Sequence, residues 1–153
     1  ITWNDNDTNE SMAKQLIAVL FGVPQVSVRL DGISREHYEV LKFYLTFWTK
    51  HRETLLDGKL KIYNPEANYS MAEAENDEEK ICVCYSRNIA EYTGRILTVV
   101  NGTGEEVIAV TADSDVSYKI LGCKGELLEN GEKSIKGIAV FNVPQSGMLI
   151  INK

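Results

Sequence analysis

Residues 40–58 read VLKFYLTFWTKHRETLLDG, and the spacing of apolar residues changes at the end of this stretch. Up to Leu55 the apolar residues recur in steps of three and four, which is typical of an amphipathic helix. Ser34 is a suitable N-cap, so we expect this helix to begin there and to end just after Leu55. Beyond this stretch the period shortens to two, which predicts β-strands. The sequence therefore predicts an α+β chain with a helical segment at 1–57 and a strand segment at 58–153.

A first helix is predicted ahead of this one. Asp7 or Thr8 can cap its start, and Gly22 followed by Pro24 ends its apolar pattern. The helix is apolar on nearly all sides, so we expect it to be almost fully buried. The alternating residues 26–30 then predict a short strand or extended segment.

The strand segment contains about eight apolar runs separated by turn residues. The run 81–85 is apolar on both faces, which predicts a central strand. Asp113-Ser114 and Asn130-Gly131 are typical of turns between strands. About eight short strands at this spacing predict an antiparallel β-sandwich. The expected strands are 59–63, 68–74, 80–86, 95–101, 105–111, 115–121, 135–142 and 147–152.

The chain carries a formal net charge of −6 and has a pI near 5.0. An acidic surface repels phosphate backbones, which argues against nucleic acid as a partner. No apolar run approaches the roughly 20 residues that span a bilayer, and the polar start does not resemble a signal peptide. We therefore expect a soluble protein with no membrane partner, and its location (periplasmic, secreted or cytoplasmic) stays open. Because the sequence begins with Ile1 rather than Met, we expect a fragment of a longer protein, with removal of a leading segment by processing as the alternative.

Residues with catalytic or metal-binding chemistry are sparse. His37 and His51 both fall on the apolar face of the long helix, too far apart to share a metal, so we expect structural roles for them. The cysteines Cys82, Cys84 and Cys123 lack the spacing of a metal knuckle and are expected to be small buried residues. Phosphate-binding loops, dinucleotide fingerprints and zinc-protease motifs do not occur. We expect no metal and no cofactor.

The chemically densest stretch is 3–8, WNDNDT, which places an aromatic ring and two carboxylates just before a buried helix. A carboxyl group at the mouth of an apolar element can serve as a general acid, because burial raises its pKa. Asp5 and Asp7 are therefore candidate catalytic residues. The alternative interpretation is a helix N-cap with solvated neighbours.

Several stretches resemble the family 36 and related α-galactosidases, also called melibiases. Residues 3–8, the helix after them and 21–25 (FGVPQ) resemble the last catalytic strand and helix of that group. Residues 40–58 resemble its final barrel helix and the exit from it. Residues 68–70 and 141–150 resemble the start and the end of its C-terminal β-sandwich. The resemblance covers the whole chain.

The resemblance implies a retaining glycosidase on a (β/α)₈ barrel, in which one aspartate is the nucleophile and another is the general acid/base. Asp5 or Asp7 would be that general acid/base, and the nucleophile would lie upstream of this chain. The intact enzyme would act on an α-linked oligosaccharide or galactoside. A retaining mechanism needs its two carboxyl groups about 5 Å apart, so we expect this chain alone to be inactive. The helical segment 1–57 would be the end of the barrel, and 58–153 the sandwich that braces it.

Two other classes of function fit the strand segment. A carbohydrate-binding module would present exposed aromatic side chains to sugar rings, but most aromatic residues of this segment fall at inward positions. A structural or oligomerisation domain is the other alternative. An apolar helix face left exposed would seek a partner, so a homo-oligomer is also an expectation.

Overall fold

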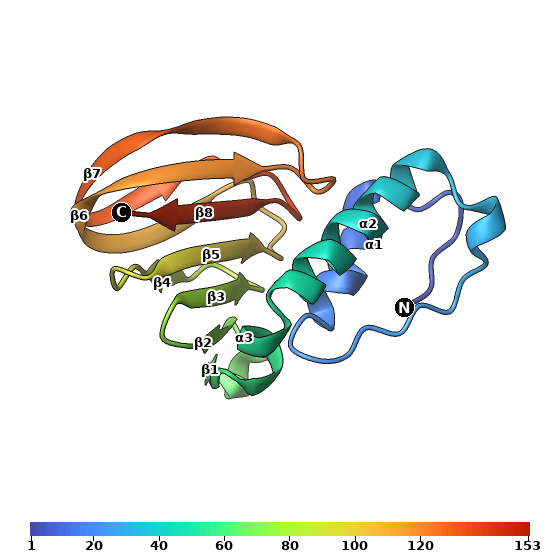
Figure 1. The fold of residues 1–153 in the computed structure, drawn as a ribbon, viewed down its shortest axis with the longest axis horizontal. Coiled ribbons are helices and arrows are strands. Elements are labelled where there is room, and N and C mark those ends of the chain that lie inside the picture. The colour runs from blue at the N-terminus through green and yellow to red at the C-terminus, as the bar shows by residue number, and fades with distance from the viewer.

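The structure, a computed structural model, describes all 153 residues. Three helices come first and an eight-stranded sheet follows, with the two longer helices side by side at one end of the sheet (Figure 1). This arrangement confirms the predicted α+β class, and the change from helix to strand falls between Asp57 and Lys59. The helices are α1 (Asn9–Ala18), α2 (Arg35–Lys50) and α3 (Arg52–Asp57), and the strands are β1 (Lys59–Tyr63), β2 (Met71–Glu75), β3 (Glu79–Cys84), β4 (Ile89–Glu91), β5 (Ile96–Asn101), β6 (Ile108–Leu121), β7 (Leu127–Phe141) and β8 (Met148–Asn152).

Side-chain hydroxyls begin both of the longer helices. Thr8 Oγ1 accepts a 3.1 Å hydrogen bond from the N–H of Ser11, and Ser34 Oγ accepts one of 3.1 Å from the N–H of His37. These caps satisfy backbone donors that have no partner within the helix. The predicted second helix is interrupted at His51, where φ is −106° and ψ is 15°, so that it forms α2 and α3.

The strand order in the sheet is β1-β2-β3-β5-β8-β6-β4, and β7 pairs with β6 alone. Most neighbours are antiparallel, but β3 with β5 and β4 with β6 are parallel. The prediction of an antiparallel sheet is wrong for these two pairs. A parallel pair needs a crossover connection, and the chain between β3 and β5 supplies it by carrying β4 to the far end of the sheet.

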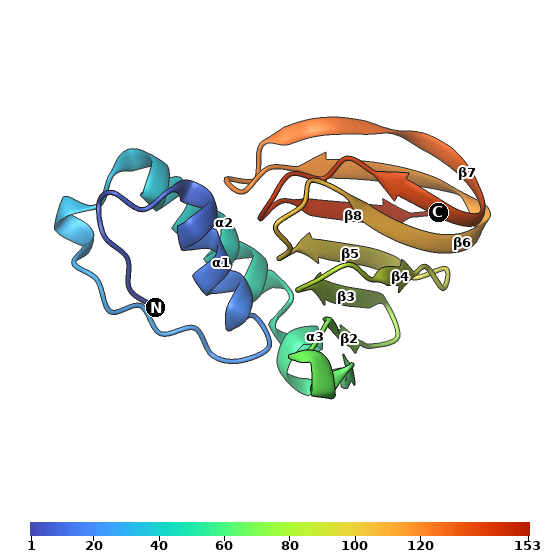
Figure 2. The ribbon, with the colours of Figure 1, turned by 180° about the vertical axis from the view of Figure 1, so that it is seen from behind.

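The sheet curls because β6 has different neighbours at its two ends. Its first half pairs with β4 and its second half with β8, while β7 accompanies it along its whole length. Figure 2 shows β6 and β7 curving together around one side of the sheet. The curl encloses an apolar interior between parts of the same sheet.

Two predicted turns lie inside strands. Asp113-Ser114 falls within β6 and Asn130-Gly131 within β7, where both stay in register with the opposite strand. The chain reverses instead at Gly122–Gly125, where the N–H of Gly125 donates a 3.0 Å hydrogen bond to the Gly122 carbonyl and Gly125 has a φ of +82°. Long continuous pairing between β6 and β7 outweighs the local turn preference of these dipeptides. Residues 26–30, predicted as a strand or extended segment, form no strand of the sheet.

Two clusters of buried side chains form the core. One fills the interior of the curled sheet, and the other lies between the helices and the sheet. β3 contributes to both, because Cys82 faces the first cluster while Ile81 and Val83 face the second. This confirms the prediction of a central strand. Fully burying one such aliphatic side chain stabilises the fold by about 1.5–3 kcal/mol.

A polar cluster fastens α3 and the end of α2 to the β2–β3 hairpin. The Glu79 carboxylate lies 2.7 Å from His51 Nδ1 and accepts a 2.5 Å hydrogen bond from Thr54 Oγ1. The side-chain amide of Asn76 donates a 2.7 Å hydrogen bond to Thr54 Oγ1. These bonds account for the structural role expected of His51.

Candidate functional site

Two extended segments lie beside each other at the N-terminal end of the molecule. The Ile1 nitrogen donates a 2.7 Å hydrogen bond to the Gln25 carbonyl, and the Ile1 carbonyl accepts one of 2.9 Å from the N–H of Ser27. Ile1 thus bonds to both neighbours of Val26, which is the pattern of two parallel strands. Helix α1 connects the two segments, and Figure 1 shows the chain between α1 and α2 passing beside the N-terminus.

Asp5 lies on the rim of a depression just beyond the end of the first segment. Its side chain is exposed, whereas the neighbouring Trp3 ring is buried. Across the depression, Arg29 Nη2 lies 2.6 Å from Asp31 Oδ2, and this hydrogen-bonded pair lowers the pKa of Asp31. The depression encloses about 520 Å³ and is lined by Thr2, Trp3, Asp5, Ser27, Val28, Arg29, Asp31, Gly32 and Ile33.

Asp7 is held within the turn that leads into α1. Its Oδ2 accepts a 2.8 Å hydrogen bond from the N–H of Asn4, and its own N–H donates a 3.0 Å bond to the Asn4 carbonyl. Its carbonyl oxygen lies 2.8 Å from Nε2 of the buried His37. The structure therefore places Asp5 at the depression and ties Asp7 into the backbone beside it.

His37 has a structural role, as predicted, but only one of its ring nitrogens makes a hydrogen bond. Because the Asp7 carbonyl can only accept, Nε2 carries the proton in this bond. Nδ1 is buried and has no hydrogen-bond partner. The ring also packs against Trp3 in a T-shaped arrangement, with 6.4 Å between ring centroids. His37 thus fixes the loop that carries Asp5 and Asp7.

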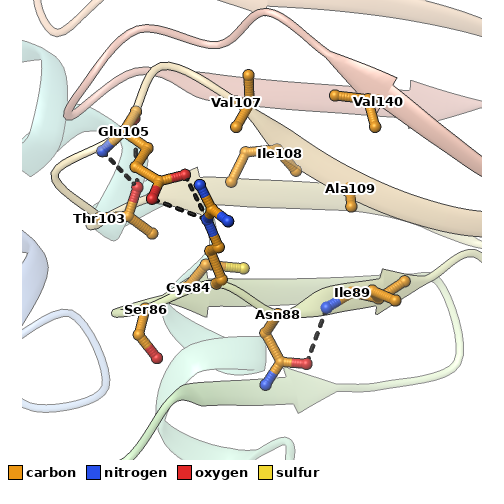
Figure 3. Close-up of a pocket in the computed structure, with 11 residues that line it drawn as sticks. Cys84, Ser86, Asn88, Ile89, Thr103, Glu105, Val107, Ile108, Ala109 and Val140 are labelled. Carbon is orange, nitrogen blue, oxygen red and sulfur yellow. Dashed lines mark hydrogen bonds and ion pairs between the residues drawn. The ribbon is translucent and has the colours of Figure 1, made fainter.

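A second hollow lies on the sheet, between the loops that follow β3 and β5 (Figure 3). Arg87 forms an ion pair with Glu105 over it, 2.7 Å from Nε to Oε2, which raises the pKa of Arg87. Burial raises the pKa of the Cys84 thiol to about 12, so this sulfur is not a nucleophile at neutral pH. The hollow encloses about 490 Å³ and is lined by Cys84, Ser86, Arg87, Asn88, Ile89, Thr103, Glu105, Val107, Ile108, Ala109 and Val140.

The remaining sequence candidates form no site. Cys82, Cys84 and Cys123 are free and buried, as expected, and burial raises the thiol pKa of each. His37 and His51 lie in separate surroundings, one beside the Asp7 carbonyl and the other against Glu79. No three His, Cys, Asp or Glu side chains lie close enough together to hold a metal ion. None of the helices combines the length and apolar content that a membrane crossing requires.

Comparison with known proteins adds no family: no protein-family model matches the chain, and neither does any curated protein sequence.

Sequence reasoning missed the polar residues that face Asp5. Helix α1 separates Arg29 and Asp31 from Asp5 in the sequence. The only hint in the sequence that these residues lie close together is the order of the elements, in which an extended segment, a helix and a second extended segment follow one another. It also missed the Arg87–Glu105 pair, whose members are 18 residues apart in loops of no evident pattern.

Proposed function

We propose that this chain is the C-terminal part of a retaining α-galactosidase-like glycoside hydrolase that acts on α-linked sugars. In this proposal the segment 1–57 supplies the last two β/α units of a catalytic barrel. The curled sheet of 58–153 acts as a β-sandwich that braces the last barrel helices. The chain alone is inactive, because the nucleophile lies on an upstream strand.

The parallel pairing of Ile1 with Gln25–Ser27 is the observation that carries this proposal. Two parallel extended segments, each followed by a helix, are the repeating unit of a (β/α)₈ barrel. Barrel enzymes place their catalytic groups just beyond the carboxyl ends of the strands. Asp5 and the Arg29–Asp31 pair occupy that position on the two segments and line one depression.

Asp5 is the more accessible candidate for the general acid/base, although its side chain is exposed and lacks the burial expected from the sequence. Its carboxylate makes no hydrogen bond within the chain and faces the depression, where a leaving-group oxygen could reach it. Asp7 already accepts the N–H of Asn4 and would have to give up that bond to transfer a proton. Trp3, which is largely buried beside Asp5, contributes to the lining of the same depression.

The test is activity of the protein encoded by the natural reading frame that contains this chain. With an unactivated α-galactoside, Asp5→Asn should lower kcat/KM by about 10²–10⁴-fold, because the leaving oxygen then lacks its proton donor. With a nitrophenyl α-galactoside the loss in kcat/KM should be much smaller, since nitrophenolate leaves without protonation, although kcat itself should still fall because the same residue activates the water in the second step. Asp77→Asn, at an exposed hairpin tip, is the matched control and should leave both rates unchanged.

Two results would refute the proposal. One is hydrolysis of a nitrophenyl α-galactoside by the isolated chain, since this chain carries no nucleophile strand. The other is a reading frame that encodes no barrel ahead of Ile1. If Asp7→Asn rather than Asp5→Asn shows the dependence on leaving group, the barrel assignment stands and the acid/base role moves to Asp7.

The alternative of a carbohydrate-binding module has weaker support. Its aromatic side chains are largely withdrawn from solvent, with Tyr92 and Phe141 buried and Tyr69 standing alone as an exposed ring. The hollow beside Arg87 contains no aromatic residue on which a sugar could stack.

A further inference from the structure

Strand β7 leaves one edge of the sheet open. It is 15 residues long and pairs only with β6. About half of its backbone N–H and C=O groups therefore point away from the sheet without a partner strand. Such an edge is a template for a further β-strand, and most side chains of β7 are exposed.

The outward side chains of β7 are the even-numbered residues. Ile135 and Ala139 point into the core, whereas Ile138 and Val140 are 62% and 55% exposed. Leu128 is 54% exposed but lies at a β-bulge, where the register between β6 and β7 shifts, so it is outside the regular part of the strand. Exposed apolar side chains on an open edge strand are a surface that a further strand can cover.

We propose that β7 pairs antiparallel with β7 of a second copy of this chain, around a two-fold axis at Ser134. This axis places Glu132 opposite Lys136 of the second copy, and Lys136 opposite its Glu132. Opposite charges directly across antiparallel strands are stabilising, and the symmetry provides the pair twice.

Neighbouring registers lack this match. An axis at Lys133 puts Glu132 opposite Ser134 on the outward face, and an axis at Ile135 puts Glu132 opposite Ile138. Because the side-chain period of a strand is two, only the axis at Ser134 places Glu132 opposite Lys136. Lys136, which disfavours pairing with an unrelated strand, thus favours pairing with β7 of a second copy.

Sedimentation velocity over a range of protein concentrations tests this, with a reducing agent present so that Cys123 cannot form disulfides. The wild-type chain should form a concentration-dependent dimer. Glu132→Lys and Lys136→Glu should each raise the dimer dissociation constant roughly tenfold or more, because two attractive pairs become repulsive. The double variant Glu132→Lys/Lys136→Glu exchanges the charges and should restore the dimer.

Arg52→Glu is the matched control, because it changes the charge by the same amount on an exposed residue at the start of α3, outside β7. Thermal unfolding of each variant checks the fold, since Lys136→Glu also faces Asp113 on β6 while Glu132→Lys faces only Ser117. A wild-type chain that stays monomeric at all concentrations would overturn the proposal. So would a dimer that both single variants leave intact, or a double variant no tighter than the singles.

Discussion

The hydroxyl of Tyr44 on α2 donates a 2.6 Å hydrogen bond to the carbonyl of Ser146, 102 residues further along the chain. Ser146 is fully buried and also donates from Oγ to the Glu10 carbonyl of α1, at 3.1 Å. Its own N–H donates a 2.8 Å hydrogen bond to the Asn101 carbonyl at the end of β5. One residue of the β7–β8 loop therefore connects both long helices to the sheet.

Tyr44→Phe should lower the free energy of unfolding by about 1–2 kcal/mol, because the buried Ser146 carbonyl loses its donor while the ring stays packed. Urea unfolding followed by circular dichroism measures this. Tyr38→Phe on the same helix is the control and should change little, since Tyr38 is exposed. Equal losses in the two variants would contradict the role given to this bond.

Alkaline pH should destabilise the fold through the same residue. Burial raises the pKa of Tyr44 well above its ordinary value of 10.0, so above that pH the unfolded chain ionises first. The contribution of Tyr44 to stability is thus complete below pH 10 and is lost as the pH rises toward the folded-state pKa. Between pH 10 and 11, the unfolding free energy of the wild type should fall more steeply than that of Tyr44→Phe, by up to about 1.4 kcal/mol per pH unit. Parallel curves for the two proteins would show that Tyr44 ionises as easily in the folded state.

Ser146 adopts a φ of +57°, in the left-handed region that disfavours side chains. Ser146→Ala and Ser146→Gly both lose the bond to Glu10, but only glycine relieves the backbone strain. The alanine variant should be less stable than the glycine variant by about 0.5–1 kcal/mol in urea unfolding. Ser86 is exposed and has no positive φ, so at this position the alanine variant should be more stable than the glycine variant.

Gly58 is required where α3 meets β1, although its φ of −67° suits any residue. An added Cβ would overlap the Thr54 carbonyl oxygen and lie 3.0 Å from that of Glu75, and neither backbone atom can move aside easily. Gly58→Ala should therefore cost about 1–3 kcal/mol. Gly104→Ala, with open space around it, should be nearly neutral, and thermal melts of the two variants give the comparison.

The helices and the central strand could be predicted from the sequence because each depends on a local pattern. Ser34 and Thr8 are the caps that the pattern indicates, and the doubly apolar run 81–85 marks a strand with a buried face on each side. The path of β4 could not be predicted, because a strand of three residues is too short to show an alternating pattern. Its partner strand, β6, also lies on the far side of the curled sheet.

The candidate site shows the same contrast between what local sequence patterns predict and what long-range contacts decide. Asp5 and Asp7 stand out in the sequence because of the residues next to them, but the difference between them depends on the Asn4 N–H, which the sequence cannot assign to either carboxylate. Arg29 and Asp31 enter the depression only because the chain returns beside Ile1 after α1. Contacts of this kind depend on how α1 packs, and no short sequence motif predicts that packing.

Stability measurements can separate the roles of the two carboxylates without any assay of activity. Asp7→Ala should lower the free energy of unfolding by about 1 kcal/mol, because the Asn4 N–H and the turn into α1 lose their acceptor. Asp5→Ala should leave stability unchanged, since the Asp5 side chain is exposed and makes no hydrogen bond within the chain. Urea unfolding of both variants and of the control Asp77→Ala measures the difference. If Asp5→Ala and Asp7→Ala lost equal stability, Asp5 would be part of the same turn. Its carboxyl group would then be no more available than that of Asp7 to protonate a leaving group.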